Sequence, residues 1–123
     1  MLKQRLLILA IVYTVILAVL SLIRLNDLPD LGFTSKDKVF HFLAYGLLML
    51  LWHIAFITDK KLKYLIRIAI SAIIYGIVLE ILQSELTSYR TSSVFDAIAN
   101  ALGVISMCLL IILVKRKTRV KKI

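Results

Sequence analysis

Four long apolar segments constrain what this chain can fold into. Residues 6–23 contain no formal charge, residues 39–58 contain only His41 and His53 as side chains that can carry a charge near neutral pH, and residues 97–114 contain no Asp, Glu, Lys, Arg or His. A helix that crosses a bilayer core of about 30 Å needs about 20 residues, so each of these segments is long enough to span a membrane. The first segment exceeds the core of about 7 to 15 residues typical of a signal peptide, and no A-x-A site follows it, so we expect it to be retained.

The remaining segment is less regular. It is apolar from Tyr64 to Leu79 except for Arg67, and a span of ordinary length must then include Glu80 and reach Gln83. We therefore predict an all-α membrane protein, a compact bundle of four transmembrane helices with short loops. Four spans use about 80 residues, which leaves room for one domain covering 1–123. The predicted helices lie at about 6–25, 39–58, 64–83 and 95–114, and a basic tail follows at 115–123.

The basic residues predict the topology. A net charge of +9 would suggest nucleic acid as a partner for a soluble protein. Here, however, twelve of the sixteen Lys and Arg residues fall in three regions: the amino terminus, residues 60–67 and the tail at 115–122. These regions share one side in a four-span chain, and the positive-inside rule assigns that side to the cytoplasm. We predict that both termini are cytoplasmic, that the tail contacts anionic membrane lipids, and that no nucleic acid is bound.

Polar side chains gather where three of the segments reach the opposite side. Residues spaced by three or four positions share one face of a helix. This spacing predicts three stripes: Asp37, His41 and Tyr45; Gly76, Glu80 and Gln83; and Asp96, Asn100 and Gly103. The glycines of these stripes would let the helices approach closely. Ionisable groups are costly in hydrocarbon, so their convergence at one depth indicates a candidate site. The candidate ligand-binding residues are Asp37, Lys38, His41, Tyr45, Glu80, Gln83, Arg90, Asp96 and Asn100.

Several of these residues also have an ordinary structural explanation. Asp37 and Asp96 each follow a Thr or Ser by three positions, as in a helix capping box. Asn100 and Gln83 can hydrogen-bond between helices, and Tyr45 can be a core aromatic residue. His41 and Glu80 fit such explanations less well. A buried carboxylate needs a proton or a cationic partner, and Arg90 is the partner that we expect for Glu80.

His41, Glu80 and Asp96 also raise the question of a metal site. The chain has no H-E-x-x-H motif and no cysteine cluster, so its spacing matches no recognised zinc site. We predict no metal ion and no cofactor. If the protein is an enzyme, the same three residues would supply acid–base catalysis.

Two sequence blocks together resemble the VanZ-like family of small polytopic bacterial membrane proteins. Residues 37–47 match the pattern D-K-x-x-H-F-x-x-Y-x-L, and residues 80–103 match E-x-x-Q, then R, then D-x-x-x-N-x-x-G, in type, order and spacing. With the flanking helices the resemblance covers nearly the whole chain.

The family is named for a protein that accompanies a glycopeptide-resistance cluster and lowers susceptibility to teicoplanin. The resemblance implies a multi-pass protein of the bacterial cytoplasmic membrane whose outward-facing polar site binds an anionic or lipid-linked cell-envelope molecule, such as an envelope precursor or a lipoglycopeptide. Lys38 and Arg90 would meet the anionic group. An intramembrane enzyme acting on lipid-linked substrates and a structural or assembly subunit without a ligand are the alternatives, and the sequence leaves the oligomeric state open.

Overall fold

The protein is an all-helical bundle. A computed structural model describes residues 2–22, 35–56, 62–86 and 94–121. These residues form four helices and no strand: α1 (Leu2–Leu22), α2 (Ser35–Ala55), α3 (Leu62–Leu86) and α4 (Val94–Lys121). The predicted all-α, four-helix fold is confirmed.

Three of the helices, α1, α3 and α4, are long and apolar enough to cross a membrane. The apolar part of α2 is shorter and runs from Val39 to Ala55, because its first turn is polar and charged. Together these helices identify a multi-pass membrane protein.

The helix boundaries differ from the predicted ones by several residues. The largest difference is at the end of α4, which was predicted at residue 114 but lies at Lys121. Hydropathy marks only the apolar part of a helix. Lys and Arg are good helix formers, and neither Gly nor Pro follows Gly103, so backbone hydrogen bonding continues into the basic tail.

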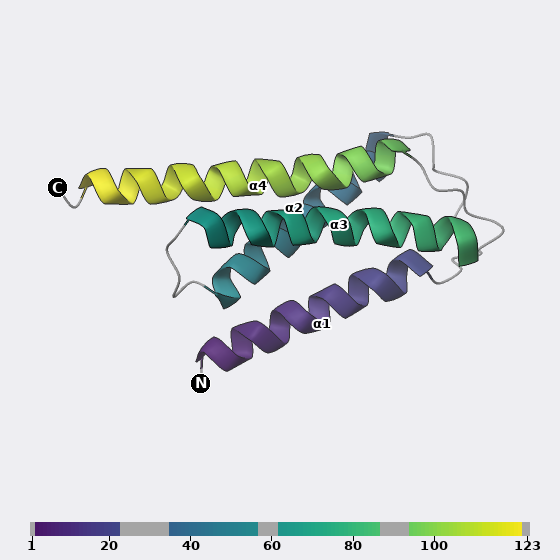
Figure 1. Ribbon diagram of the computed structural model, residues 1–123, viewed down its shortest axis with the longest axis horizontal. Coiled ribbons are helices and arrows are strands. Elements are labelled where there is room, and N and C mark those ends of the chain that lie inside the picture. The colour runs from purple at the N-terminus through teal and green to yellow at the C-terminus, as the bar shows by residue number, and fades with distance from the viewer. Residues whose placement is uncertain (1, 23–34, 57–61, 87–93, 122–123) are drawn as a thin grey trace.

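The second helix organises the bundle. It contacts the other three helices, most extensively α4, whereas α1 contacts only α2 and α3 among the described helices. In Figure 1, α2 crosses behind α3 and α4, and both chain termini lie at the same end of the bundle. The opposite end therefore contains the last turns of α1 and α3 and the first turns of α2 and α4.

Glycines bring α2, α3 and α4 close together. A Cβ atom on Gly103 would collide with the backbone carbonyl of Phe42, so the backbones of α4 and α2 are in direct contact there. A Cβ on Gly76 would lie 2.9 Å from Cε2 of Tyr45 and 3.3 Å from Nδ2 of Asn100. Without a hydrophobic force between helices in lipid, such close van der Waals packing drives association. The sequence-based expectation that Gly76 and Gly103 permit close approach is confirmed.

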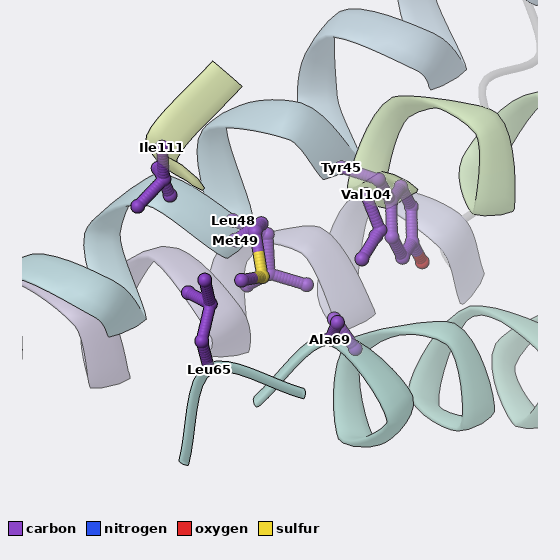
Figure 2. Close-up of a cluster of buried hydrophobic side chains, with 8 residues drawn as sticks. Tyr45, Leu48, Met49, Leu65, Ala69, Val104 and Ile111 are labelled. Atoms are coloured by element: carbon purple, nitrogen blue, oxygen red, sulfur yellow. The ribbon is translucent and has the colours of Figure 1, made fainter. Parts of the chain in front are cut away.

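The apolar core lies between α2, α3 and α4. Figure 2 shows Leu48 and Met49 at its centre and Tyr45 beside Val104. The buried members of the cluster are Tyr45, Leu48, Met49, Leu65, Ala69, Ala72, Val104 and Ile111. Only Ala10 is buried in α1, so this helix packs beside the core and contributes little to it.

Side-chain hydrogen bonds attach α1 to its neighbours. Thr14 lies at the centre of these contacts. Its hydroxyl accepts a hydrogen bond from Nε1 of Trp52 at 2.8 Å and donates one to the carbonyl of Ala10 at 2.7 Å. Its own carbonyl accepts one from the Tyr75 hydroxyl at 2.5 Å. The Tyr13 hydroxyl adds a bond to the carbonyl of Ala44 at 2.6 Å.

Candidate functional site

Four of the predicted site residues meet at the end of the bundle opposite the termini. His41 comes from α2, Glu80 from α3, and Asp96 and Asn100 from the first two turns of α4. We call these four residues the polar cluster. Ligand atoms of His41, Glu80 and Asp96, one from each side chain, all lie within 4.8 Å of one another. Three helices must therefore be assembled before these groups come together.

The hydrogen bond to Asn100 orients the His41 ring. Nδ1 of His41 lies 2.9 Å from Oδ1 of Asn100. An amide oxygen can only accept a hydrogen bond, so the proton of the neutral ring belongs on Nδ1. The lone pair is then on Nε2, which lies 3.7 Å from Oδ2 of Asp96.

The polar cluster is partly open. Asn100 is 2% exposed and Glu80 is 8% exposed, which places both inside the bundle. Asp96 is also buried, with 9% of the residue exposed, whereas the His41 side chain is 25% exposed. A molecule at this end of the bundle could therefore reach His41, while Asn100, Glu80 and Asp96 support it from within.

The charge of the polar cluster is unbalanced within itself. The two carboxylates of Glu80 and Asp96 lie near the single imidazole of His41. A low dielectric makes this arrangement expensive unless a proton or a further cation joins the group. Chemically, the cluster offers one nitrogen and two carboxylate groups as ligands, and a histidine lone pair as a base.

The structure assigns Gln83 and Tyr45 to helix packing. Nε2 of Gln83 donates a hydrogen bond to the carbonyl of Ser21 in α1 at 2.8 Å. Tyr45 is 3% exposed and belongs to the apolar core. Both residues sit on the predicted stripes, but they join helices together as in the alternative explanation.

Three predicted site residues are not placed. Asp37 and Lys38 lie in the first turn of α2, and their side chains are outside the described residues; Arg90 is outside them altogether. The predicted pairing of Glu80 with Arg90 therefore also lies outside the described part of the chain.

Sequence reasoning did not identify the hydroxyl groups that hold α1. Tyr13, Thr14 and Tyr75 each make an interhelical hydrogen bond. The available signal was the presence of hydroxyl groups in otherwise apolar spans, where a polar group needs a partner inside the protein.

Comparison with known proteins adds one relative. A protein of Schizosaccharomyces pombe described as uncharacterized is 36% identical over 95 residues, which are 77% of this chain and 57% of that protein. The chain thus spans a little over half the length of this relative. No family model matches the chain, and no solved structure matches it. The relative's description assigns no activity, so the resemblance to VanZ-like proteins stands on the sequence motifs alone.

Proposed function

We propose that this chain is a VanZ-like membrane protein that binds an anionic or lipid-linked cell-envelope molecule beside the polar cluster. The observation that carries the proposal is the convergence of four polar residues from three helices at one end of the bundle, with His41 still 25% exposed. A network used only for packing has no need of an accessible member.

Positive charge for the ligand would come from the segments that border the cluster. Lys38 precedes His41 by one helical turn, and Arg90 belongs to the segment that joins α3 to α4. Asn100 and Glu80 would keep the bordering groups oriented. An anionic headgroup at this end would meet both the cations and the partly exposed imidazole.

The proposed location is the cytoplasmic membrane of a bacterium, with both termini in the cytoplasm and the polar cluster toward the outside. The termini share one end of the bundle. At the start of α3, Lys63 and Arg67 lie 5.3 Å and 5.5 Å from the centre of the Tyr64 ring. Such an aromatic residue with cations around it is typical of a membrane interface, and an excess of cations is typical of the cytoplasmic one.

An intramembrane enzyme acting on lipid-linked substrates is the second candidate. It is favoured by the fixed orientation of His41, whose Nε2 lone pair faces Asp96. A positioned imidazole of this kind can act as a general base. Turnover of an envelope lipid by the purified protein would identify this function.

Two charge-matched double variants test the binding function. Wild type, Lys38→Ala/Arg90→Ala and Lys63→Ala/Arg67→Ala are purified in the same mild detergent, and copurifying lipids are identified by mass spectrometry. We expect an anionic envelope lipid with wild type and with the second variant, and its loss from the first. Equal lipid content in all three proteins would reject the proposal. Teicoplanin susceptibility of a strain with and without the protein tests the resistance role that the resemblance implies.

A further inference from the structure

The three titratable residues of the polar cluster lie close to the spacing of ligands around one ion. Nε2 of His41 and Oδ2 of Asp96 are 3.7 Å apart, which exceeds the hydrogen-bond range of about 2.7–3.2 Å. Two ligands that each lie about 2.1 Å from a tetrahedral metal ion are about 3.4 Å apart. The His41–Asp96 pair is within about 0.3 Å of that spacing, and three groups that all lie within 4.8 Å of one another reach it if the side chains close by up to about 1.4 Å.

The surroundings of His41 are those of a metal ligand. A histidine that binds a metal through one nitrogen commonly donates its other N–H to a carbonyl or carboxylate oxygen, which fixes the tautomer. Asn100 supplies this oxygen at 2.9 Å from Nδ1, and Nε2 is the nitrogen turned toward Asp96. Asn100 is 2% exposed, so its position is set by the bundle.

Asn100 also has a second, unused donor. Its Nδ2 atom is buried and makes no hydrogen bond within the described residues. This atom faces α3 beside Gly76, one helical turn before Glu80. An oxygen-bearing ligand of an ion would supply the acceptor that this donor lacks.

We propose that the polar cluster binds one divalent ion of the first transition row, Zn²⁺ or Mn²⁺, through Nε2 of His41 and the carboxylates of Glu80 and Asp96. Imidazole favours zinc and the other transition metals, whereas carboxylates also suit manganese, so the mixed set selects this class over Mg²⁺ and Ca²⁺. Three protein ligands leave at least one coordination position for an oxygen of a bound molecule, and its occupation by an anionic headgroup rests on the proposed function.

Metal analysis of the purified full chain tests this site. Wild type without a histidine tag is stripped with EDTA, incubated with Zn²⁺ or Mn²⁺, desalted and measured by inductively coupled plasma mass spectrometry. We expect one ion per chain. His41→Gln and Asp96→Asn should each lose the ion, whereas His53→Gln should retain it, because His53 is the other histidine of the chain and lies in the last turn of α2, away from the polar cluster.

A second measurement, on wild type alone, does not depend on the folding of the variants. Co²⁺ bound to the stripped protein should give visible d–d absorption bands that Zn²⁺ displaces. No retained ion in wild type, a preference for Mg²⁺ or Ca²⁺ over Zn²⁺ and Mn²⁺, or equal ion content in wild type and a folded His41→Gln would overturn the metal site. One ion per chain without copurifying lipid would support the metal site and reject the proposed function. Copurifying lipid without a bound ion would support the proposed function and reject the metal site.

Discussion

At the scale of single residues, the polar cluster divides into accessible and supporting members. His41 is the most exposed member; its Nε2 lies near Asp96 and its Nδ1 hydrogen-bonds to Asn100. Asn100 is almost fully enclosed and contacts α2 and faces α3 as well. A change at His41 should therefore affect binding more than stability, and a change at Asn100 should affect both.

We expect His41→Ala to insert and fold with a loss of about 1 kcal/mol in the free energy of unfolding, the usual net value of one hydrogen bond. Water can replace the imidazole because the site is partly open. The variant should also lose the copurifying lipid. Unfolding by titration with a denaturing detergent and lipid analysis measure the two effects. Aggregation of His41→Ala, with His53→Ala behaving normally, would instead indicate a packing network without a ligand.

Residue spacing predicted which side chains converge, but not what each of them does. The positions of His41, Glu80, Asp96 and Asn100 follow from helical periodicity and from their common depth. Tyr45 and Gln83 occupy the same stripes, yet they point into the core and toward α1. That difference depends on the rotation and tilt of each helix, which packing against neighbours determines and the spacing within one helix does not.

At the scale of helices, two kinds of contact hold the bundle together. The α2–α4 pair relies on backbone contact at glycine, whereas α1 relies on hydrogen bonds centred on Thr14. Sequence patterns predicted the first kind through Gly76 and Gly103. They did not predict the second, because a threonine or tyrosine in an apolar span does not reveal which neighbour it faces. The sequence did not predict the helix ends either, because the apolar segment ends before the helix does, as in α4.

A methyl group at Gly103 should separate α2 from α4. We expect Gly103→Ala to lower the free energy of unfolding by about 3 kcal/mol, at the upper end of the cost of overpacking, because a fixed backbone carbonyl of Phe42 occupies the space. Gly46→Ala is the matched control. Its Cβ would lie 3.4 Å from the carbonyl oxygen of Gly103, an ordinary contact, so its effect should be small. Equal stability of the two variants in the denaturing-detergent titration would contradict the close approach of α2 and α4.

Replacement of the Thr14 hydroxyl tests the attachment of α1. Thr14→Val keeps the shape of the side chain but removes the acceptor of the Trp52 indole N–H. We expect the lost hydrogen bond to lower the free energy of unfolding by about 1 kcal/mol and to shift the tryptophan emission to the blue. The emission reports on this site alone because the chain has a single tryptophan. Thr14→Ser retains the hydroxyl and should resemble wild type. If serine and valine destabilise equally, the hydrogen bond contributes nothing.

At the scale of the whole molecule, the two ends of the bundle differ in charge. The end with the termini carries most of the basic residues, and the other end carries the polar cluster. Cationic residues flanking a span favour the cytoplasmic side during insertion. The asymmetry therefore predicts the orientation of the polar cluster as well as that of the termini.

Reporter fusions measure this orientation. A reporter that is active only outside the cytoplasm should be silent when it follows Lys122 and active when it is inserted near Ser88, between α3 and α4. A reporter active only in the cytoplasm provides the matched control and should give the opposite pattern. Activity of the external reporter at the carboxyl terminus would show that the polar cluster faces inward.

The partnership of α2 with α4 also sets an order of events during synthesis. Translation from Ala55 to Gly103 takes about 2 to 10 seconds at about 5–20 residues per second. Throughout that interval α2 has neither the amide oxygen that accepts from His41 nor the glycine surface against which Phe42 packs. The nascent chain thus passes through a three-helix stage with a polar, uncovered helix in the bilayer. Quality control of this protein should act at that stage. A defect in α4 should be recognised through the polar surface that α2 leaves uncovered.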